Sequence, residues 1–288
     1  MIRHRTVDVD GLPIHYREAG TPGNPVLLLL HGFPASSFMF RDLMPLLADR
    51  FHLVVPDYPG FGHSALPDGF DFTFEGLTDA VEAFTERLDL PSFGLYLQDF
   101  GGPVGFRLAT RKPERVEFLV VQNANAYEEG LPDGFWATPR QVWADPSPAN
   151  RTALREAAMN DQVLEWNYTH GTVDPSAISP DSWVLQKALL DRPGNRDAML
   201  DLLVDYRSNP PLYPQWQAYL RAHRPPTLIV WGRNDEIFPA SGARAYLRDL
   251  PDAELHLLDT GHFALEDHAD VIAEHIRRFA AQPISSTR

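Results

Sequence analysis

The amino-acid sequence predicts an α/β fold in which a mostly parallel sheet is covered by helices on both faces and carries a helical insertion. Continuous apolar runs alternate with amphipathic helical stretches over most of the 288 residues, a pattern typical of a parallel sheet that is buried on both sides. The alternation stops between about residues 126 and 222, and that stretch holds five of the six tryptophans. A chain of this length can bury one large core together with such an insertion.

The expected elements follow this order along the chain. Residues 5–17 alternate around Asp10-Gly11, a pair typical of a hairpin turn. Later strands are expected at residues 25–32, 51–57, 95–97, 116–123, 226–232 and 253–259. Helices are expected at residues 38–48, 74–88 and 240–250, after Gly101, and at the C-terminal end.

The insertion divides the chain into two predicted parts. Residues 1–125 and 223–288 would form the α/β core, and residues 126–222 would form an aromatic helical cap. Open α/β sheets bind ligands beyond the carboxyl ends of their strands, so we expect the cap to cover an active site there.

Composition excludes several classes of function. A net charge of −14 argues against nucleic-acid or membrane partners, and no stretch reaches the roughly 18 apolar residues of a membrane span. The absence of cysteine excludes thiol catalysis. The first residues lack the apolar segment of a signal peptide, so a cytoplasmic protein is expected. A monomer and a homodimer are both compatible with the sequence.

Polar side chains follow several of the expected strands and should meet at one edge of the sheet. They lie in H-G-F-P (31–34), D-Y-P-G-F-G-H-S (57–64), the Asp99 turn, N-D-E around Asp235, and G-H-F around His262. Taken singly, Asp99 could cap a helix, Asp235 could belong to a turn, and His262 could be a core histidine. Their joint order and spacing instead predict a nucleophile, an acid and a base.

The chain as a whole resembles the α/β-hydrolase superfamily. H-G-F-P together with Q-D-F-G-G (98–102) resembles its epoxide hydrolase and haloalkane dehalogenase branches. The resemblance implies an eight-stranded, mostly parallel sheet and catalysis without a metal or cofactor. It assigns Asp99 as nucleophile, His262 as base and Asp235 as its acid partner, with the N–H groups of Phe33 and Phe100 as the oxyanion hole.

An aspartate at the position where such hydrolases often carry serine narrows the chemistry. A carboxylate that attacks an acyl carbon would form a reactive anhydride, whereas at a saturated carbon it displaces a leaving group and forms an alkyl ester. Water activated by His262 would then hydrolyse that ester at Asp99. Esterase, lipase and peptidase activities are therefore disfavoured.

The leaving group separates two hypotheses, with a small apolar epoxide or an organohalide as substrate. A halide needs N–H donors, which dehalogenases commonly supply after the H-G turn and after the nucleophile. Phe33 and Phe100 occupy these places, and Phe100 also differs from the arginine typical of the fluoroacetate branch. Conversely, Leu97-Gln98-Asp99 is more similar to the dehalogenase elbow. We favour an epoxide hydrolase, with a dehalogenase and a non-catalytic ligand-binding protein as alternatives.

An epoxide oxygen needs a proton donor, and the cap supplies tyrosines. Tyr206 lies 29 residues before Asp235, near where epoxide hydrolases carry a ring-opening tyrosine, and Tyr168 is the second candidate. Trp166 or His170 could serve instead of Tyr168, while Tyr213 and Tyr219 are expected to pack. Pocket-lining side chains are expected at Trp166, His31 and Pro34.

Overall fold

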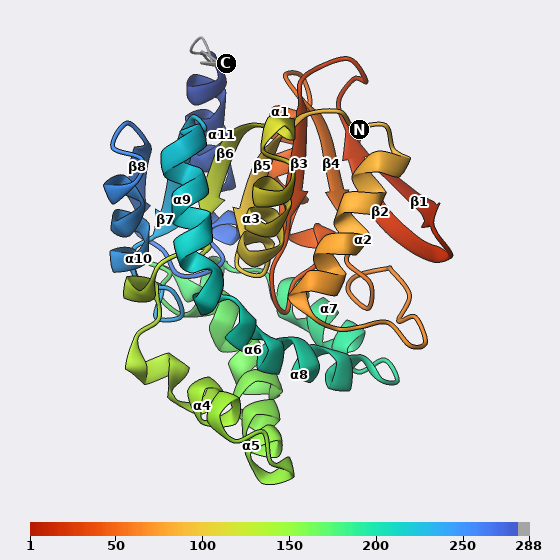
Figure 1. Cartoon of the computed structure of the whole chain (residues 1–288), viewed down its shortest axis with the longest axis vertical. Coiled ribbons are helices and arrows are strands. Elements are labelled where there is room, and N and C mark those ends of the chain that lie inside the picture. Colours follow the sequence, from red (N-terminus) through yellow and green to blue (C-terminus); the bar gives the residue numbers. More distant parts are fainter. Residues whose placement is uncertain (282–288) are drawn as a thin grey trace.

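One sheet of eight strands organises the computed structural model, which describes residues 1–281. The strand order is β1-β2-β4-β3-β5-β6-β7-β8; β1 and β2 run antiparallel to their neighbours, and the other pairs are parallel (Figure 1). The predicted fold is thereby confirmed. The strands are β1 (Arg3–Val9), β2 (Leu12–Ala19), β3 (Val26–Leu30), β4 (His52–Pro56), β5 (Phe93–Gln98), β6 (Val116–Gln122), β7 (Thr227–Gly232) and β8 (Glu254–Leu258).

The first two strands form the predicted hairpin. Val9 pairs with Leu12, so Asp10 and Gly11 are the only loop residues, with φ values of 51° and 88°. Positive φ at both central positions matches the right-handed twist of the strands, and Asp-Gly is a pair that adopts it readily.

The sheet separates two apolar cores because alternate strand residues point to opposite faces. Leu28 and Leu30 belong to one core, while Leu27 and Leu29 belong to the other. Helices α2 (Phe74–Arg87), α3 (Gly101–Arg111) and α9 (Tyr213–His223) pack on the first side. Helices α1 (Leu43–Leu47) and α11 (Leu265–Ala281) pack against each other on the second, and α10 (Ala240–Ala245) follows β7.

Two expected helices are shorter than the sequence pattern suggested. The stretch 38–48 divides into a 3-10 turn, Ser37–Phe40, and the short α1. Pro45 lies in the first turn of α1, where its missing N–H costs nothing, but it could not continue a helix from further upstream. The stretch 240–250 likewise changes from α10 to a 3-10 turn at Tyr246–Arg248.

Five further helices lie together beyond the carboxyl ends of the parallel strands, in the lower part of Figure 1. They are α4 (Asp133–Ala144), α5 (Pro148–Met159), α6 (Asp161–Thr169), α7 (Asp181–Leu190) and α8 (Asn195–Asp205). Helix α9 instead packs beside α3, where the Trp216 ring stacks on Phe106 with centroids 5.4 Å apart. Helices α4–α8 are therefore the elements placed to cover the strand ends.

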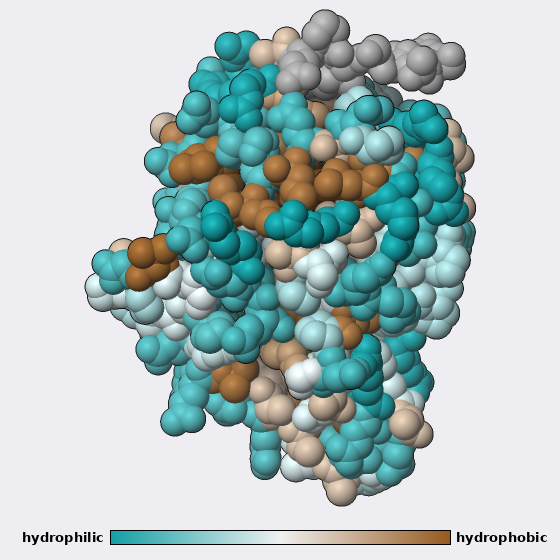
Figure 2. Space-filling view, turned by 90° about the vertical axis from the view of Figure 1, so that its left-hand side faces the viewer, coloured by the Kyte–Doolittle hydropathy of each residue, from teal (hydrophilic) through white to brown (hydrophobic). Residues whose placement is uncertain are grey.

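The surface on the β8 side is largely hydrophilic, with a band of hydrophobic side chains across its upper part (Figure 2). Strand β8 is an edge of the sheet, and its Leu255 and Leu257 are only partly buried. Within residues 1–281, every helix is too short or too polar to cross a bilayer.

Candidate active site

A sharp turn between β5 and α3 presents the Asp99 side chain at the carboxyl edge of the sheet. Asp99 has a φ of 48°, in the left-handed region that non-glycine residues rarely adopt. Two glycines allow neighbouring segments to approach this turn closely. A Cβ on Gly101, two residues after Asp99, would collide with the Leu30 carbonyl, and a Cβ on Gly32, in the loop after β3, would collide with Asp99 itself. The local sequence thus forms a strand–turn–helix elbow.

The two oxygens of the Asp99 carboxylate have different surroundings. Oδ1 accepts a 2.6 Å hydrogen bond from the Phe33 N–H, and the Phe100 N–H also hydrogen-bonds the carboxylate. Oδ2 lies 3.7 Å from His262 Nε2. Burial raises the pKa of Asp99 to about 6, although His262 and the two N–H groups favour the charged form. One oxygen is therefore anchored, and the other is left for attack.

His262 is oriented by Asp235 from its far side. Nδ1 lies 2.8 Å from Asp235 Oδ2, and both side chains are buried. Burial opposes charge on the imidazole, but the Asp235 carboxylate outweighs it and raises the pKa of His262. Gln98 Nε2 lies 3.2 Å from His262 Nε2, so the residue before Asp99 also contacts this ring. The arrangement leaves Nε2 facing Asp99, as a base for water requires.

Asn123, directly after β6, connects these groups and was not among the residues singled out from sequence. Its Nδ2 donates to Asp235 Oδ2 at 2.7 Å, and its Oδ1 accepts from the Gly232 N–H at 3.0 Å. Its carbonyl accepts from the Asp99 N–H at 3.2 Å. The Ile237 N–H donates to the other carboxylate oxygen, Asp235 Oδ1, at 2.7 Å. The sequence signal for Asn123 was the polar pair Gln122-Asn123 at the end of an apolar strand.

A cavity of about 250 Å³ lies between Asp99 and the helices α4, α5, α6 and α8. Apart from Asp99, the polar side chains among its lining residues within 1–281 are Thr138 and Asn167. The apolar lining residues are Phe33, Phe100, Phe135, Trp136, Pro139, Leu154, Ala157, Ala158, Val163, Leu203 and Ile237. This wall suits a small apolar molecule. Within residues 1–281 no three His, Asp or Glu side chains are grouped as metal ligands.

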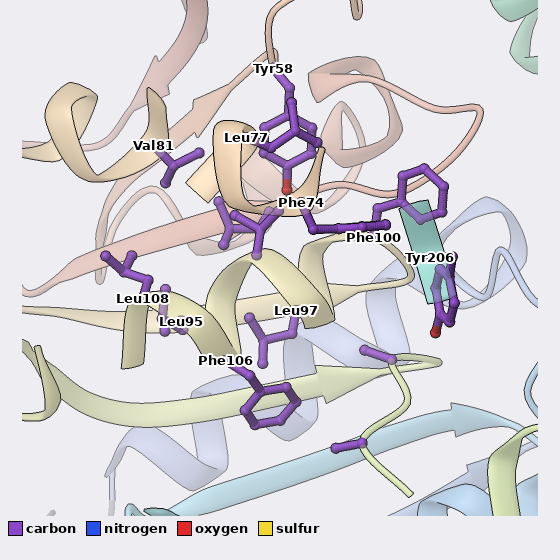
Figure 3. Close-up of a cluster of buried hydrophobic side chains, with 14 of the residues drawn as sticks. Tyr58, Phe74, Leu77, Val81, Leu95, Leu97, Phe100, Phe106, Leu108 and Tyr206 are labelled. Carbon is purple, nitrogen blue, oxygen red and sulfur yellow. The ribbon is translucent and has the colours of Figure 1, made fainter. Parts of the chain in front are cut away.

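Tyr206 lies immediately behind the cavity wall. Its ring packs 4.6 Å from Trp136 and 6.1 Å from Phe100, measured between centroids, and Figure 3 shows it beside Phe100. Its hydroxyl has no partner at hydrogen-bond geometry within the described chain, although Tyr213 is close enough to affect it. Burial, with Tyr213 and Asp99, raises the pKa of Tyr206 well above its usual value. The hydroxyl therefore keeps its proton.

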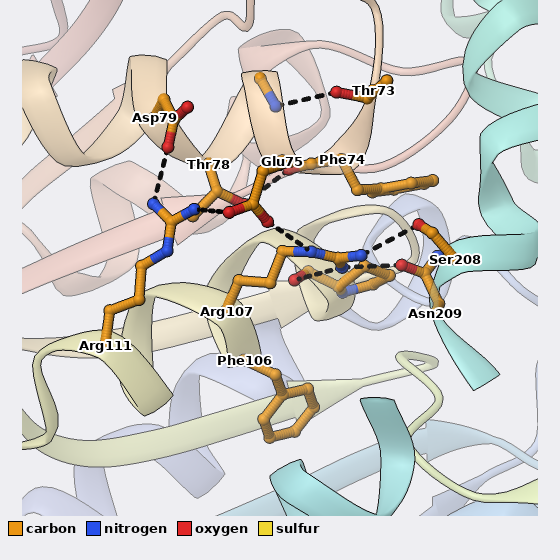
Figure 4. Close-up of polar contacts among 12 residues, drawn as sticks. Thr73, Phe74, Glu75, Thr78, Asp79, Phe106, Arg107, Arg111, Ser208 and Asn209 are labelled. Atoms are coloured by element: carbon orange, nitrogen blue, oxygen red, sulfur yellow. Dashed lines mark hydrogen bonds and ion pairs between the residues drawn. The ribbon is translucent and has the colours of Figure 1, made fainter. Parts of the chain in front are cut away.

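The turn that carries Tyr206 is tied to the helix that follows Asp99. Arg107 of α3 donates to Asn209 Oδ1 at 2.7 Å and to Ser208 Oγ at 3.0 Å, as Figure 4 shows. The same guanidinium lies 3.4 Å from Glu75 of α2. Arg107 thus fixes the segment after Tyr206 relative to the elbow.

The structure does not bring Tyr168 to the cavity. Its ring stacks on Phe263 with centroids 4.1 Å apart, and it belongs to the core on the opposite side of the sheet from Tyr206. The charged groups that influence its pKa are Glu266 and Arg41 rather than Asp99. Tyr168 is therefore a packing residue in this arrangement, and the prediction that it donates to substrate loses its geometric basis.

The three expected pocket residues also lie outside the cavity wall. His31 is fully buried beneath the Tyr58 ring, which lowers its pKa to about 4. Pro34 is buried beside it in the same loop. Trp166 stacks on His170 at 4.6 Å and borders a smaller hollow next to His262. Their positions are explained by packing.

Known proteins resemble this chain over nearly its whole length. A family model described as the alpha/beta hydrolase fold matches residues 25–269. "Uncharacterized hydrolase YNR064C" of Saccharomyces cerevisiae is 42% identical, covering 95% of both chains. A "Haloalkane dehalogenase" of Mesorhizobium japonicum is 31% identical over 91% of this chain and 85% of its own. The crystal structure of Cfl2 from Burkholderia cenocepacia superposes with a TM-score of 0.80 at 25% identity, covering 96% of this chain and 95% of Cfl2.

Proposed function

The chain belongs to the α/β-hydrolase fold family, and we propose that it opens epoxides to vicinal diols through an ester on Asp99. The observation that carries the proposal is the divided Asp99 carboxylate, with Oδ1 held by the Phe33 N–H and Oδ2 turned toward His262. In the first step Oδ2 attacks a ring carbon and the ring C–O bond breaks. Its electron pair moves to the ring oxygen, which takes a proton from the Tyr206 hydroxyl.

The second step regenerates the carboxylate. His262 removes a proton from water, which attacks the carbonyl carbon of the ester, while Asp235 stabilises the imidazolium. The Phe33 and Phe100 N–H groups, which already contact the carboxylate, stabilise the negative oxygen. The bond between the carbonyl carbon and Oδ2 breaks, and Oδ2 leaves in the diol with the proton from His262. The hydroxyl from water, now part of Asp99, releases its proton to solvent, and Tyr206 regains a proton from solvent.

The cap favours an epoxide oxygen over a halide as the leaving group. Two indole N–H groups near the cavity are already occupied, because Trp136 donates to the Ile237 carbonyl at 2.9 Å and Trp143 donates to the Leu203 carbonyl at 3.4 Å. The Tyr206 hydroxyl, just behind the cavity wall, is one of the buried donors that have no partner at hydrogen-bond geometry within residues 1–281. An alkoxide needs a proton, whereas a halide needs only N–H donors, so this distribution supports epoxide opening.

A second candidate is dehalogenation of a small organohalide by the same three residues. The relatives named haloalkane dehalogenase, at 29–31% identity, favour it. It differs from the first candidate in the leaving atom and predicts the same kind of ester on Asp99.

The test is to offer styrene oxide and 1-bromobutane to the wild-type protein and to His262→Gln, with Asp99→Asn/His262→Gln as the matched control. We expect diol from the wild type and an Asp99 adduct with the mass of the epoxide in His262→Gln, because losing the base slows hydrolysis about 100-fold or more. Intact-mass spectrometry and peptide mapping measure it. Bromide release without diol would favour the second candidate. Absence of an adduct from both compounds would refute Asp99 as the nucleophile.

A further inference from the structure

Asn167 is a buried amide that faces the cavity without a partner. It lies in α6, is 6% exposed, and lines the cavity that Asp99 also lines. Within residues 1–281 no side chain or backbone group lies at hydrogen-bond geometry from its side-chain amide. Its amide atoms are open to the cavity rather than closed off behind the wall, so the molecule that occupies the cavity supplies their hydrogen-bond partners. A substrate group that enters the cavity would satisfy it.

The helix determines which of two neighbouring residues can meet the substrate. Successive residues of an α-helix point about 100° apart, and Tyr168 is turned to Phe263 while Asn167 is turned to the cavity. Asn167 also borders the smaller hollow that contains His262. It therefore lies between the cavity and the hollow beside His262.

The geometry of displacement directs the leaving atom toward the cap. Asp99 Oδ1 is held by Phe33, so Oδ2 attacks the carbon. The leaving atom departs on the side of that carbon opposite Asp99, toward the wall formed by helices α4, α5, α6 and α8. The polar groups in this wall are Thr138 and Asn167, and only Asn167 borders both hollows.

We propose that the Asn167 amide donates a hydrogen bond to the leaving atom of the substrate, the ring oxygen of an epoxide. This inference rests on the proposed function. The amide transfers no proton: as the ring C–O bond breaks it stabilises the developing negative oxygen, which takes its proton from Tyr206. Hydrogen bonds to charged groups are stronger than those to neutral ones, so the contact strengthens as the ring opens.

The test measures ester formation and ester hydrolysis separately. In the His262→Gln background, Asn167→Leu should slow ester formation from styrene oxide roughly 10- to 100-fold, followed by intact mass against time. Glu165→Gln, on the exposed part of the same helix, is the matched control and should keep the parent rate. Asn167→Asp keeps the side-chain shape but loses the amide donors, so it should also form the ester slowly. It provides the test if Asn167→Leu disturbs folding.

The outcomes separate this inference from the proposed function. Ester formation in Asn167→Leu at the parent rate would overturn the inference while leaving Asp99 as nucleophile. In the background with native His262, accumulation of ester by Asn167→Leu would show that the amide serves the hydrolytic water, and would overturn it too. If His262→Gln alone forms no ester, the proposed function fails and the inference falls with it.

Discussion

The two walls of the cavity are built in different ways. On the sheet side, Asp235 accepts hydrogen bonds from Asn123 and the Ile237 N–H as well as contacting His262. On the cap side, the amide of Asn167 and the hydroxyl of Tyr206 have no partner at hydrogen-bond geometry within the described chain. The Asp235–His262 pair is therefore held by the protein before substrate arrives, while the Asn167 amide faces the cavity and the Tyr206 hydroxyl lies just behind its wall.

This difference indicates a division of labour between the walls. Groups fixed by several hydrogen bonds hold the nucleophile and base in one geometry, which lowers the cost of reaching the transition state. Unpartnered donors on the cap instead suit a leaving atom that gains charge only during reaction. Substitutions of the cap donors should therefore affect ester formation, and substitutions around the Asp235–His262 pair should affect hydrolysis.

Replacement of the cap hydroxyl is expected to give the largest effect of the three changes considered next. Tyr206→Phe removes the proton donor for the ring oxygen, so ester formation from styrene oxide should slow about 100-fold. Single-turnover mass spectrometry in the His262→Gln background measures it. Tyr168→Phe is the matched control, because that ring packs on Phe263, and its rate should stay within about twofold of the parent. Equal rates for both variants would remove Tyr206 from the mechanism.

The sheet side was predictable from sequence to a degree that the cap was not. Asp99, Asp235 and His262 each follow an apolar strand, and parallel topology alone requires such strand ends to meet at one edge. A helix side chain has no such constraint, because its direction depends on which face packs against the core. The sequence therefore pointed to Tyr168, whereas the structure places its neighbour Asn167 at the cavity.

Loop residues were the second source of error. His31 belongs to the H-G turn beside Phe33, and proximity in sequence suggested a place in the pocket. In the structure the chain turns at Gly32, so the Phe33 side chain lines the cavity while the His31 ring lies beneath Tyr58. Which side of a turn is buried is a tertiary property that the local sequence does not determine.

Removing a hydrogen bond from the sheet side should give an intermediate effect, on ester hydrolysis rather than on ester formation. Asn123→Gly keeps the backbone φ of 44° accessible but removes the amide that orients Asp235. Ester hydrolysis should slow roughly 10- to 100-fold, since a hydrogen bond to a carboxylate is lost, and the Asp99 ester should accumulate in single turnovers. Ester formation should change less. A variant slowed only in ester formation would contradict the assignment of roles to the two walls.

The smallest expected effect is the pH dependence of ester formation, which tests whether the titrating groups lie on the sheet side. Burial raises the pKa of Asp99 to about 6, so the attacking carboxylate is lost as the pH falls through that value. At pH 5 about a tenth remains ionised, and ester formation in single turnovers of the wild type should fall about tenfold from its plateau at neutral pH. Hydrolysis in the wild type should also weaken as the pH falls, because the pKa of His262 is raised and only the neutral imidazole accepts a proton. Tyr206→Phe should lower the plateau without moving the midpoint, because the titrating carboxylate belongs to the sheet side. If the pH midpoint moves in Tyr206→Phe, the cap hydroxyl influences the ionisation of Asp99, and the assignment of the titrating group to the sheet side alone is wrong.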